Sequence, residues 1–137
     1  MSDFLLDPRL AADTLTVLDL HLSRLLMMRD GNYPWLILVP RRSGAVEILD
    51  LDTADRARLW DEVERVAAAL AAETGADKLN VAALGNVVSQ LHVHVIARFR
   101  DDAAWPAPVW GKVPPIGLDE AKAAALVAAL KMRLAAA

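Results

Sequence analysis

The sequence predicts an α+β domain with an antiparallel sheet of about five strands, a long central helix and a C-terminal helix. Two observations predict this class. Apolar strand-like segments stand on both sides of one long stretch with helical periodicity, so the element order is helix, strands, helix, strands, helix. The turn signal Asp30-Gly31-Asn32 separates two of the strand-like segments, which indicates an antiparallel hairpin.

The first part of the chain supplies a short helix and the hairpin. Asp7-Pro8 has the pattern of an N-cap followed by a proline in the first helical turn. Residues 14–28 predict one or two strands with a break near His21. Residues 35–39, with the sequence WLILV, predict the next strand, which Pro40 ends.

The central helix is predicted over residues 51–74. Thr53 is the candidate N-cap, and Gly75 suits the position just after the last helical residue. Four apolar residues repeat at helical spacing and predict one buried face: Trp60, Val63, Ala67 and Leu70.

The second part of the chain returns to strands and ends in a helix. Residues 79–84 predict a strand and Gly85-Asn86 a turn or bulge, while residues 87–100 carry the longest strand pattern. Two prolines predict a loop over residues 105–111 because proline removes backbone donors. The alanine-rich residues 118–137 predict the last helix.

Composition excludes several classes of protein. The 137 residues fit one domain, and a hydrophobic content of 55% argues against disorder. A net charge of -3 gives no basis for expecting a nucleic-acid partner, and the absence of cysteine excludes disulfides and thiolate chemistry. Without a signal-peptide pattern or an apolar run long enough to span a membrane, we expect a cytoplasmic protein with no membrane partner.

The segment Gln90-Leu-His-Val-His-Val-Ile96 is the most informative stretch of the chain. Side chains alternate between the two faces of a strand, so Gln90, His92 and His94 are predicted to share one face. The apolar residues between them, with Ala97, are predicted to pack on a helix. A row of this kind can present ring nitrogens to one ligand.

Three interpretations of the two histidines stay open at this point. They could be incidental residues on a half-exposed strand, or two metal ligands that need a third, for which His21 is the only other histidine. They could also perform nucleophilic catalysis at phosphorus. The surroundings favour catalysis, because Asn80, Gly85 and Asn86 offer neutral groups that bind phosphate, and no carboxylate lies between Asp77 and Asp101. We therefore predict no metal site.

The histidine segment resembles the motif of the histidine triad (HIT) family of nucleotide-binding hydrolases and transferases, which is His-x-His-x-His-x-x. Two of the three histidines are present here. The order of Asn80, Gly85-Asn86, the motif and Arg98 is similar to the family's arrangement, and so is the hairpin from Asp30 to Pro40. The helix from about Thr53 also falls where the family has one. The resemblance covers roughly residues 4–100.

The resemblance implies a function and a set of roles. His92 would be the nucleophile that forms a nucleotidyl-histidine at the α-phosphate, and His94 would contact the phosphate and help the leaving group depart. Gln90 would be an orienting group. The other implied roles are phosphate binding by Asn80 and Asn86 and ribose binding by Asp30, although all three are also ordinary turn formers.

The resemblance also implies a substrate class and an assembly. The substrate would be a purine nucleotide or nucleotide conjugate, such as a dinucleoside polyphosphate, a phosphoramidate or a nucleotidyl-sugar. No cofactor would be required, although a divalent cation could accompany a polyphosphate. We expect one HIT-like domain over residues 1–137 that forms a homodimer, with residues 1–13 as an N-terminal helix or arm and residues 101–137 as a loop and helix extension.

Two departures from the family motif affect the prediction. Gln90 replaces the first histidine, and Trp35 stands where many members have a further histidine on the hairpin strand. Glutamine does not titrate near neutral pH, so it could not relay a proton. We therefore predict either a slow enzyme or an enzyme whose substrates have leaving groups that need little protonation. The substitution Gln90→His is then expected to raise the turnover of substrates with poor leaving groups. The first alternative is a nucleotide-binding module with weak or lost catalysis, and the second is a His-x-His metal-binding protein.

Two tryptophans receive a structural interpretation from the sequence, and one arginine receives none. Trp105 and Trp110 flank the proline loop and are predicted to fill a domain edge or a subunit contact rather than to form a base-stacking lid. Arg98 is assigned no role, because it is placed opposite or beyond the histidines.

Overall fold

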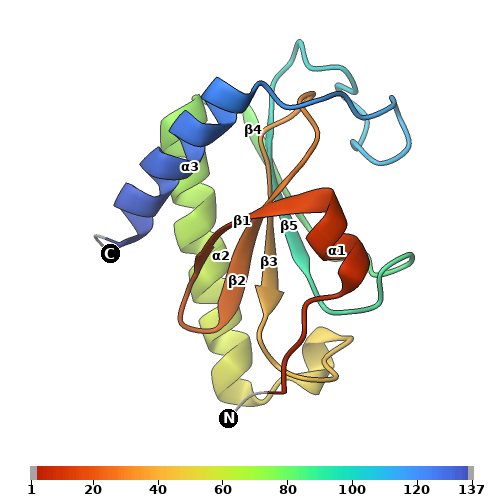
Figure 1. The fold of residues 1–137 in the computed structure, drawn as a ribbon, viewed down its shortest axis with the longest axis vertical. Coiled ribbons are helices and arrows are strands. Elements are labelled where there is room, and N and C mark those ends of the chain that lie inside the picture. The colour runs from red at the N-terminus through yellow and green to blue at the C-terminus, as the bar shows by residue number, and fades with distance from the viewer. Residues whose placement is uncertain (1–2, 136–137) are drawn as a thin grey trace.

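The computed structural model describes residues 3–135 and contains one five-stranded antiparallel sheet, in the order β1-β2-β3-β5-β4 (Figure 1). The strands are β1 (Thr14–Asp19), β2 (Ser23–Met28), β3 (Trp35–Pro40), β4 (Lys78–Ala82) and β5 (Val93–Arg98). Strand β5 pairs with both β3 and β4, so the strand that carries His94 lies inside the sheet, and His92 directly precedes it. The predicted α+β class with an antiparallel five-stranded sheet is confirmed.

Two helices cover one face of the sheet. They are α2 (Thr53–Thr74) and α3 (Glu120–Ala135), which lie together on the same side in Figure 1. The main hydrophobic core lies between these helices and the sheet, and it includes Leu59, Leu70 and Leu130 from the helices and Val93 and Val95 from β5. The predicted apolar face of the histidine strand therefore does pack on a helix.

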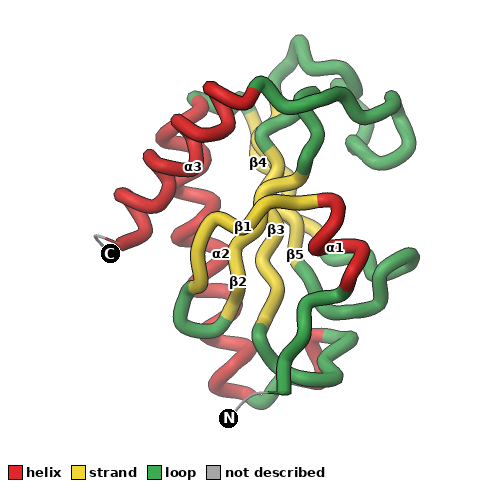
Figure 2. Tube along the Cα trace, in the orientation of Figure 1, coloured by secondary structure: helices red, strands yellow, loops and turns green. Residues whose placement is uncertain are grey.

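The opposite face of the sheet carries the short helix α1 (Pro8–Asp13) and long loop segments, which are drawn in green in Figure 2. A second apolar cluster lies beneath them and includes Leu10 from α1, Trp35 from β3, Ile96 from β5 and Val109 from the proline loop. This second layer is the side of the sheet toward which the even-numbered residues of β5 point.

The helix ends follow local rules. Asp7 caps α1 by accepting a hydrogen bond from the backbone N–H of Arg9, as the sequence predicted. The N-cap of α2 is Asp52 and not Thr53, because the Asp52 carboxylate accepts from the backbone N–H of Asp55. Gly75 follows α2 with a positive φ of 67°, a conformation that glycine adopts without steric cost.

The predicted strand over residues 87–100 is shortened in the structure to β5, Val93–Arg98. The preceding segment leaves the sheet because its polar groups bond elsewhere. The backbone N–H of Leu91 donates to the carbonyl of Ala45, and the Gln90 side chain bonds to the backbone of residues 5 and 7. Gln90 therefore does not share a regular strand face with His94.

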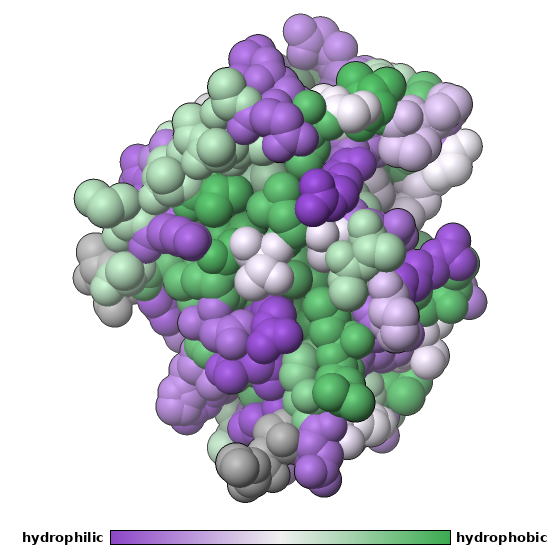
Figure 3. Space-filling view, viewed as in Figure 1, coloured by the Kyte–Doolittle hydropathy of each residue, from purple (hydrophilic) through white to green (hydrophobic). Residues whose placement is uncertain are grey.

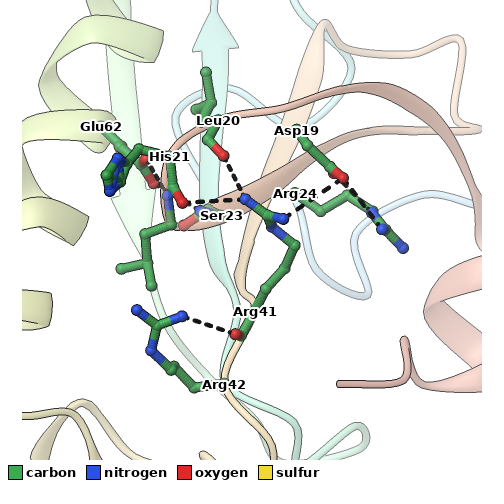
Figure 4. Close-up of polar contacts among 9 residues, drawn as sticks. Asp19, Leu20, His21, Ser23, Arg24, Arg41, Arg42 and Glu62 are labelled. Carbon is green, nitrogen blue, oxygen red and sulfur yellow. Dashed lines mark hydrogen bonds and ion pairs between the residues drawn. The ribbon is translucent and has the colours of Figure 1, made fainter. Parts of the chain in front are cut away.

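His21 lies in the turn between β1 and β2, which is fastened to α2 and β3 (Figure 4). The buried Glu62 carboxylate accepts hydrogen bonds from the backbone N–H groups of Leu22 and Ser23 at 2.8 and 2.9 Å. Arg41 Nη2 donates to the carbonyl of His21 at 3.1 Å. His21 thus belongs to a structural turn rather than to the histidine strand.

Hydrophilic side chains are distributed over the face of the molecule shown in Figure 3, with apolar residues exposed between them. Within residues 3–135, none of the helices combines the length and the apolar character that a membrane crossing requires.

Candidate functional site

His92 and His94 line a pocket of ≈ 250 Å³ between β5, α1 and the segment that precedes the histidines. We call it the histidine pocket. Its other lining residues include Arg9 from α1, Gly85 and Asn86 from the preceding segment, and Trp110 from the proline loop. The structure therefore brings together three of the residues predicted from the sequence, namely His92, His94 and Asn86.

The ring of His92 is held in one orientation by a backbone carbonyl. His92 Nδ1 lies 2.6 Å from the carbonyl oxygen of Gln90, and only 7% of the residue is exposed. A carbonyl oxygen accepts but cannot donate, so Nδ1 carries the proton in this contact. In the neutral ring the lone pair then lies on Nε2, which is the form that a nucleophilic imidazole requires.

His94 is held in the opposite tautomer. The indole Nε1–H of Trp35 donates to His94 Nδ1 at 2.9 Å, across the β3–β5 pairing. Because an indole nitrogen can only donate, Nδ1 must accept, and the single proton of the neutral ring lies on Nε2. Trp35 therefore supports His94 and not the residue at position 90.

The electrostatics keep His94 neutral. Burial of the imidazole, and then the charge of the neighbouring His92, lower the pKa of His94 from its ordinary value of 6.5 to about 3. The two imidazole rings lie 4.9 Å apart between their centroids. The pair thus places the Nε2 atom of His92, whose Nδ1 contacts the Gln90 carbonyl, beside a neutral N–H donor on His94.

Trp110 completes the aromatic surroundings of His94. Its ring lies 5.1 Å from the His94 ring and 5.8 Å from the Trp35 ring, both edge-on. Trp110 thus lines the histidine pocket and also packs against the second apolar cluster, whereas the sequence predicted a place at a domain edge or a subunit contact. Trp105 does have a structural place, where it lies 5.6 Å from the buried Arg98 guanidinium.

A second pocket of ≈ 390 Å³ adjoins the histidine pocket, and the two share Asp13, Met28 and Trp110. We call it the adjoining pocket. Trp35 and Val109 give it apolar walls, and Asp30 lies at its edge. An apolar slot with a carboxylate beside it suits a flat ring system that carries hydroxyl groups.

Asp30 has a structural role as well as a place in the adjoining pocket. Its Oδ1 accepts from the backbone N–H and the side-chain amide of Asn32, both at 2.9 Å, and from the N–H of Ile116 at 3.4 Å. All three contacts use the same oxygen. The turn-forming interpretation of Asp30 is therefore correct, and the ribose interpretation stays a prediction for the other oxygen.

Asn80 lies outside both pockets and supports a buried arginine instead. Its Oδ1 accepts from Arg98 Nη1 at 2.8 Å. Arg98 is only 1% exposed and donates to the Asp102 carboxylate through Nε and Nη2, at 2.7 and 3.0 Å, and to the carbonyl of Ala107 at 2.8 Å. These hydrogen bonds from Arg98 lower the pKa of Asp102 to about 2. Asn80 Oδ1 is thus engaged by Arg98, and the implied phosphate contact of Asn80 stays a prediction.

The role of Arg98 was not predicted from the sequence. The structure places it on the side of β5 that faces α1 and the loops, and not opposite the histidines. Two features of the sequence could have predicted this position. Arg98 has an even number, as His92 and His94 do, and the acidic Asp102 follows four residues later.

The segment of residues 102–117, which we call the 102–117 loop, is fastened near both ends. The Arg98–Asp102 pair holds its start, as described above. Near its end, the side-chain amide of Asn32 donates to the carbonyl of Pro114 at 3.0 Å, and the N–H of Gly31 donates to the carbonyl of Ile116 at 2.9 Å. The loop is thus a fixed wall that holds Trp110 against His94.

The Gln90 side chain does not contact His92. Its Oε1 accepts from the backbone N–H of Asp7 at 2.8 Å, and its Nε2 donates to the carbonyl of Leu5 at 2.8 Å. Only the backbone carbonyl of Gln90 orients His92. The side chain instead fastens residues 3–7, which we call the N-terminal arm.

No group of three or more histidine, cysteine, aspartate or glutamate side chains within residues 3–135 is arranged to hold a metal ion. His21, the only candidate for a third histidine ligand, lies beside α2 with Asp61 and Arg65 and lines neither pocket described above. His21 therefore does not join His92 and His94 in one cluster.

Comparison with known proteins identifies the family. The model of the HIT domain matches residues 9–101. The chain belongs to the histidine triad family. Its similarity to three solved HIT proteins extends over almost the whole chain, well beyond the matched residues. A search of curated protein sequences gave no significant match.

The three solved HIT proteins come from bacteria. The histidine triad protein from Bradyrhizobium japonicum is 51% identical, with coverage of 96% of this chain and 98% of that one and a TM-score of 0.95. That from Marinobacter aquaeolei is 45% identical, with 96% of each chain covered and a TM-score of 0.92. The histidine triad protein from Sinorhizobium meliloti is 43% identical, with coverage of 96% of this chain and 97% of that one and a TM-score of 0.93.

Proposed function

We propose that this HIT protein is a hydrolase or nucleotidyl transferase that acts at the α-phosphate of a nucleoside phosphate derivative through a covalent nucleotidyl-histidine at His92. The observation that carries the proposal is the contact between His92 Nδ1 and the Gln90 carbonyl, because it directs the lone pair of Nε2 to be the reactive one. Candidate substrates are dinucleoside polyphosphates, phosphoramidates and nucleotidyl-sugars.

The reaction proceeds in two displacements. In the first, His92 Nε2 attacks the α-phosphorus, a P–N bond forms, and the bond to the leaving group breaks with its electron pair going to that group. In the second, a water or another acceptor attacks the same phosphorus. The P–N bond then breaks, its electron pair returns to Nε2, and the proton of the attacking group passes to solvent.

The phosphate oxygens are held by neutral donors. His94 offers Nε2–H, and Asn86 lines the same pocket with a side-chain amide. Because the low pKa of His94 keeps it neutral, it stabilises the phosphate by hydrogen bonding and is a poor source of a proton for the leaving group. Asn80 acts indirectly, through Arg98.

The nucleoside occupies the adjoining pocket. Trp35, Trp110 and Met28 provide an apolar site for a purine ring, and the second oxygen of Asp30 accepts from the ribose hydroxyls. A divalent cation, when present, is carried by a polyphosphate substrate rather than held by the protein. By analogy with the family we also propose a homodimer, which light scattering during gel filtration tests.

Intact-protein mass spectrometry tests the covalent step. Wild type and His92→Ala are mixed briefly with an adenosine phosphoramidate and, in parallel, with a diadenosine polyphosphate. A transient adduct of one nucleoside monophosphate in wild type alone is expected. Absence of both adduct and product, with nucleotide binding still measurable by calorimetry, would identify the chain as a binding module instead.

A further inference from the structure

Gln90 fastens the N-terminal arm to the segment that carries the catalytic histidines. Its amide makes one bond to the backbone of Leu5 and one to that of Asp7, both at 2.8 Å. An amide can accept and donate at once, whereas a neutral imidazole presents its donor and acceptor in another geometry. The residue that departs from the family motif therefore has a defined structural partner.

The fastened arm determines where α1 begins. Asp7, whose backbone N–H bonds to Gln90, is also the N-cap of α1 and accepts from the N–H of Arg9 at 2.8 Å. Two residues beyond Asp7, Arg9 lines the histidine pocket together with His92, His94 and Asn86. The position of Arg9 at this pocket therefore depends on the contact with Gln90.

Arg9 supplies positive charge to a pocket whose other hydrogen-bond donors are neutral and whose lining also includes the Asp13 carboxylate. Among the described residues that line the histidine pocket, it is the single lysine or arginine. Its nearest acidic group is Asp13, at 3.9 Å between Nε and Oδ2, and the Arg9 side chain is 66% exposed. An exposed ion pair at this distance is weak, so the guanidinium can turn toward an anionic ligand.

The site offers little means to protonate a leaving group. His94 is neutral with its Nδ1 occupied by Trp35, and the Gln90 amide is engaged by the arm and cannot titrate. A leaving group that departs as a stable anion needs no proton. A phosphate released from a phosphoanhydride is such a group, and a cation beside it stabilises the charge that develops.

We propose that Arg9, positioned by Gln90 through the N-terminal arm, binds the phosphate of the leaving group and makes this site selective for nucleoside phosphoanhydrides over phosphoramidates. This inference rests on the proposed function, since it concerns the same displacement at the α-phosphorus. Arg9 is the specificity-determining residue and Gln90 is a positioning residue.

Steady-state kinetics with two substrates test the inference. We compare kcat/KM for diadenosine tetraphosphate and for an adenosine phosphoramidate in wild type, Arg9→Ala and Arg100→Ala. Arg100 is the matched control, because it is 77% exposed and its ion pair with Asp77 is also 3.9 Å long. Arg9→Ala is expected to lower kcat/KM for the anhydride about 10- to 100-fold, the usual effect of losing a charge-assisted hydrogen bond. It should change the phosphoramidate value by less than about threefold, while Arg100→Ala changes neither.

A double-mutant cycle tests the part played by Gln90. Gln90→Ala is expected to lower the ratio of anhydride to phosphoramidate activity, as Arg9→Ala does. In the Arg9→Ala background the same substitution should lower that ratio by less than about twofold, because its effect passes through Arg9. A residue that only maintained folding would lower both activities in parallel and would leave the ratio unchanged.

The outcomes separate this inference from the proposed function. If wild type forms the His92 adduct and Arg9→Ala lowers both activities equally, or neither, the inference is wrong and the proposed function stands. If wild type forms no adduct and turns over neither substrate, both are wrong. A selective loss of anhydride activity in Arg9→Ala and in Gln90→Ala supports the inference.

Discussion

His94 is expected to make the stability of the protein depend on pH in the mildly acidic range. The perturbation is a decrease of pH from 7.5 to 4.5 in wild type and in His94→Gln. Glutamine retains an acceptor for the Trp35 indole N–H, which donates to His94 at 2.9 Å in the native structure, but it does not titrate. The difference between the two proteins therefore isolates the protonation of His94.

The sign and size of the effect follow from the pKa of His94. Burial lowers this pKa from 6.5 to about 3, so between these pH values the unfolded state binds a proton that the folded state does not. Stability is therefore fully present above pH 6.5 and is lost as the pH falls toward 3. At about 1.4 kcal/mol per pH unit, the loss from this one group reaches about 2–3 kcal/mol at pH 4.5.

Urea unfolding followed by tryptophan fluorescence measures this difference at a series of pH values. Asp102 interferes little above pH 4.5, because its hydrogen bonds with Arg98 lower its pKa from 3.8 to about 2. We expect wild type to lose about 2–3 kcal/mol more than His94→Gln between pH 7.5 and 4.5. Parallel pH curves for the two proteins would mean that folded His94 titrates normally, and would refute the reasoning.

Three further predictions follow from the contacts of the site. Trp35→Phe leaves buried His94 Nδ1 without a donor, so we expect a loss of about 1–3 kcal/mol in urea unfolding and a higher His94 pKa by NMR titration; an unchanged pKa would contradict this. Asp102→Asn breaks a buried ion pair with Arg98 and should cost about 3–5 kcal/mol in thermal unfolding, whereas a cost below about 1 kcal/mol would show that the pair is dispensable. Gln90→His should not raise phosphoramidate turnover, contrary to the expectation from sequence, because the side chain at this position points to the N-terminal arm; increased turnover would show that it reaches the leaving group.

The function of the 102–117 loop illustrates what the family motif leaves out. The match to the HIT domain ends at residue 101, yet Trp110 from this loop lies 5.1 Å from His94. The loop is held by Asn32 and by the Arg98–Asp102 pair, while Asn80 supports Arg98 in turn. Asn80, which resembles a phosphate ligand in sequence, therefore contributes in this structure to the support of a wall of the site.

The sequence by itself determined the features that depend on neighbouring residues. The two-residue period of a strand placed Val93 and Val95 on the core face, and local chemistry placed the cap at Asp7 and the left-handed glycine at position 75. The spacing of His92 and His94 within an apolar segment was enough to indicate a histidine site. All of these are rules about residues one to four positions apart.

Only the tertiary structure decided which partner each polar side chain binds. Gln90 bonds to backbone groups 83 and 85 positions away, Trp35 fixes the tautomer of His94 across 59 positions, and Arg98 joins Asn80 from a neighbouring strand. A glutamine, an asparagine or an arginine can satisfy its hydrogen bonds with many partners of equal chemistry. The packing of the two layers on the sheet selects among those partners, and the residue type alone cannot.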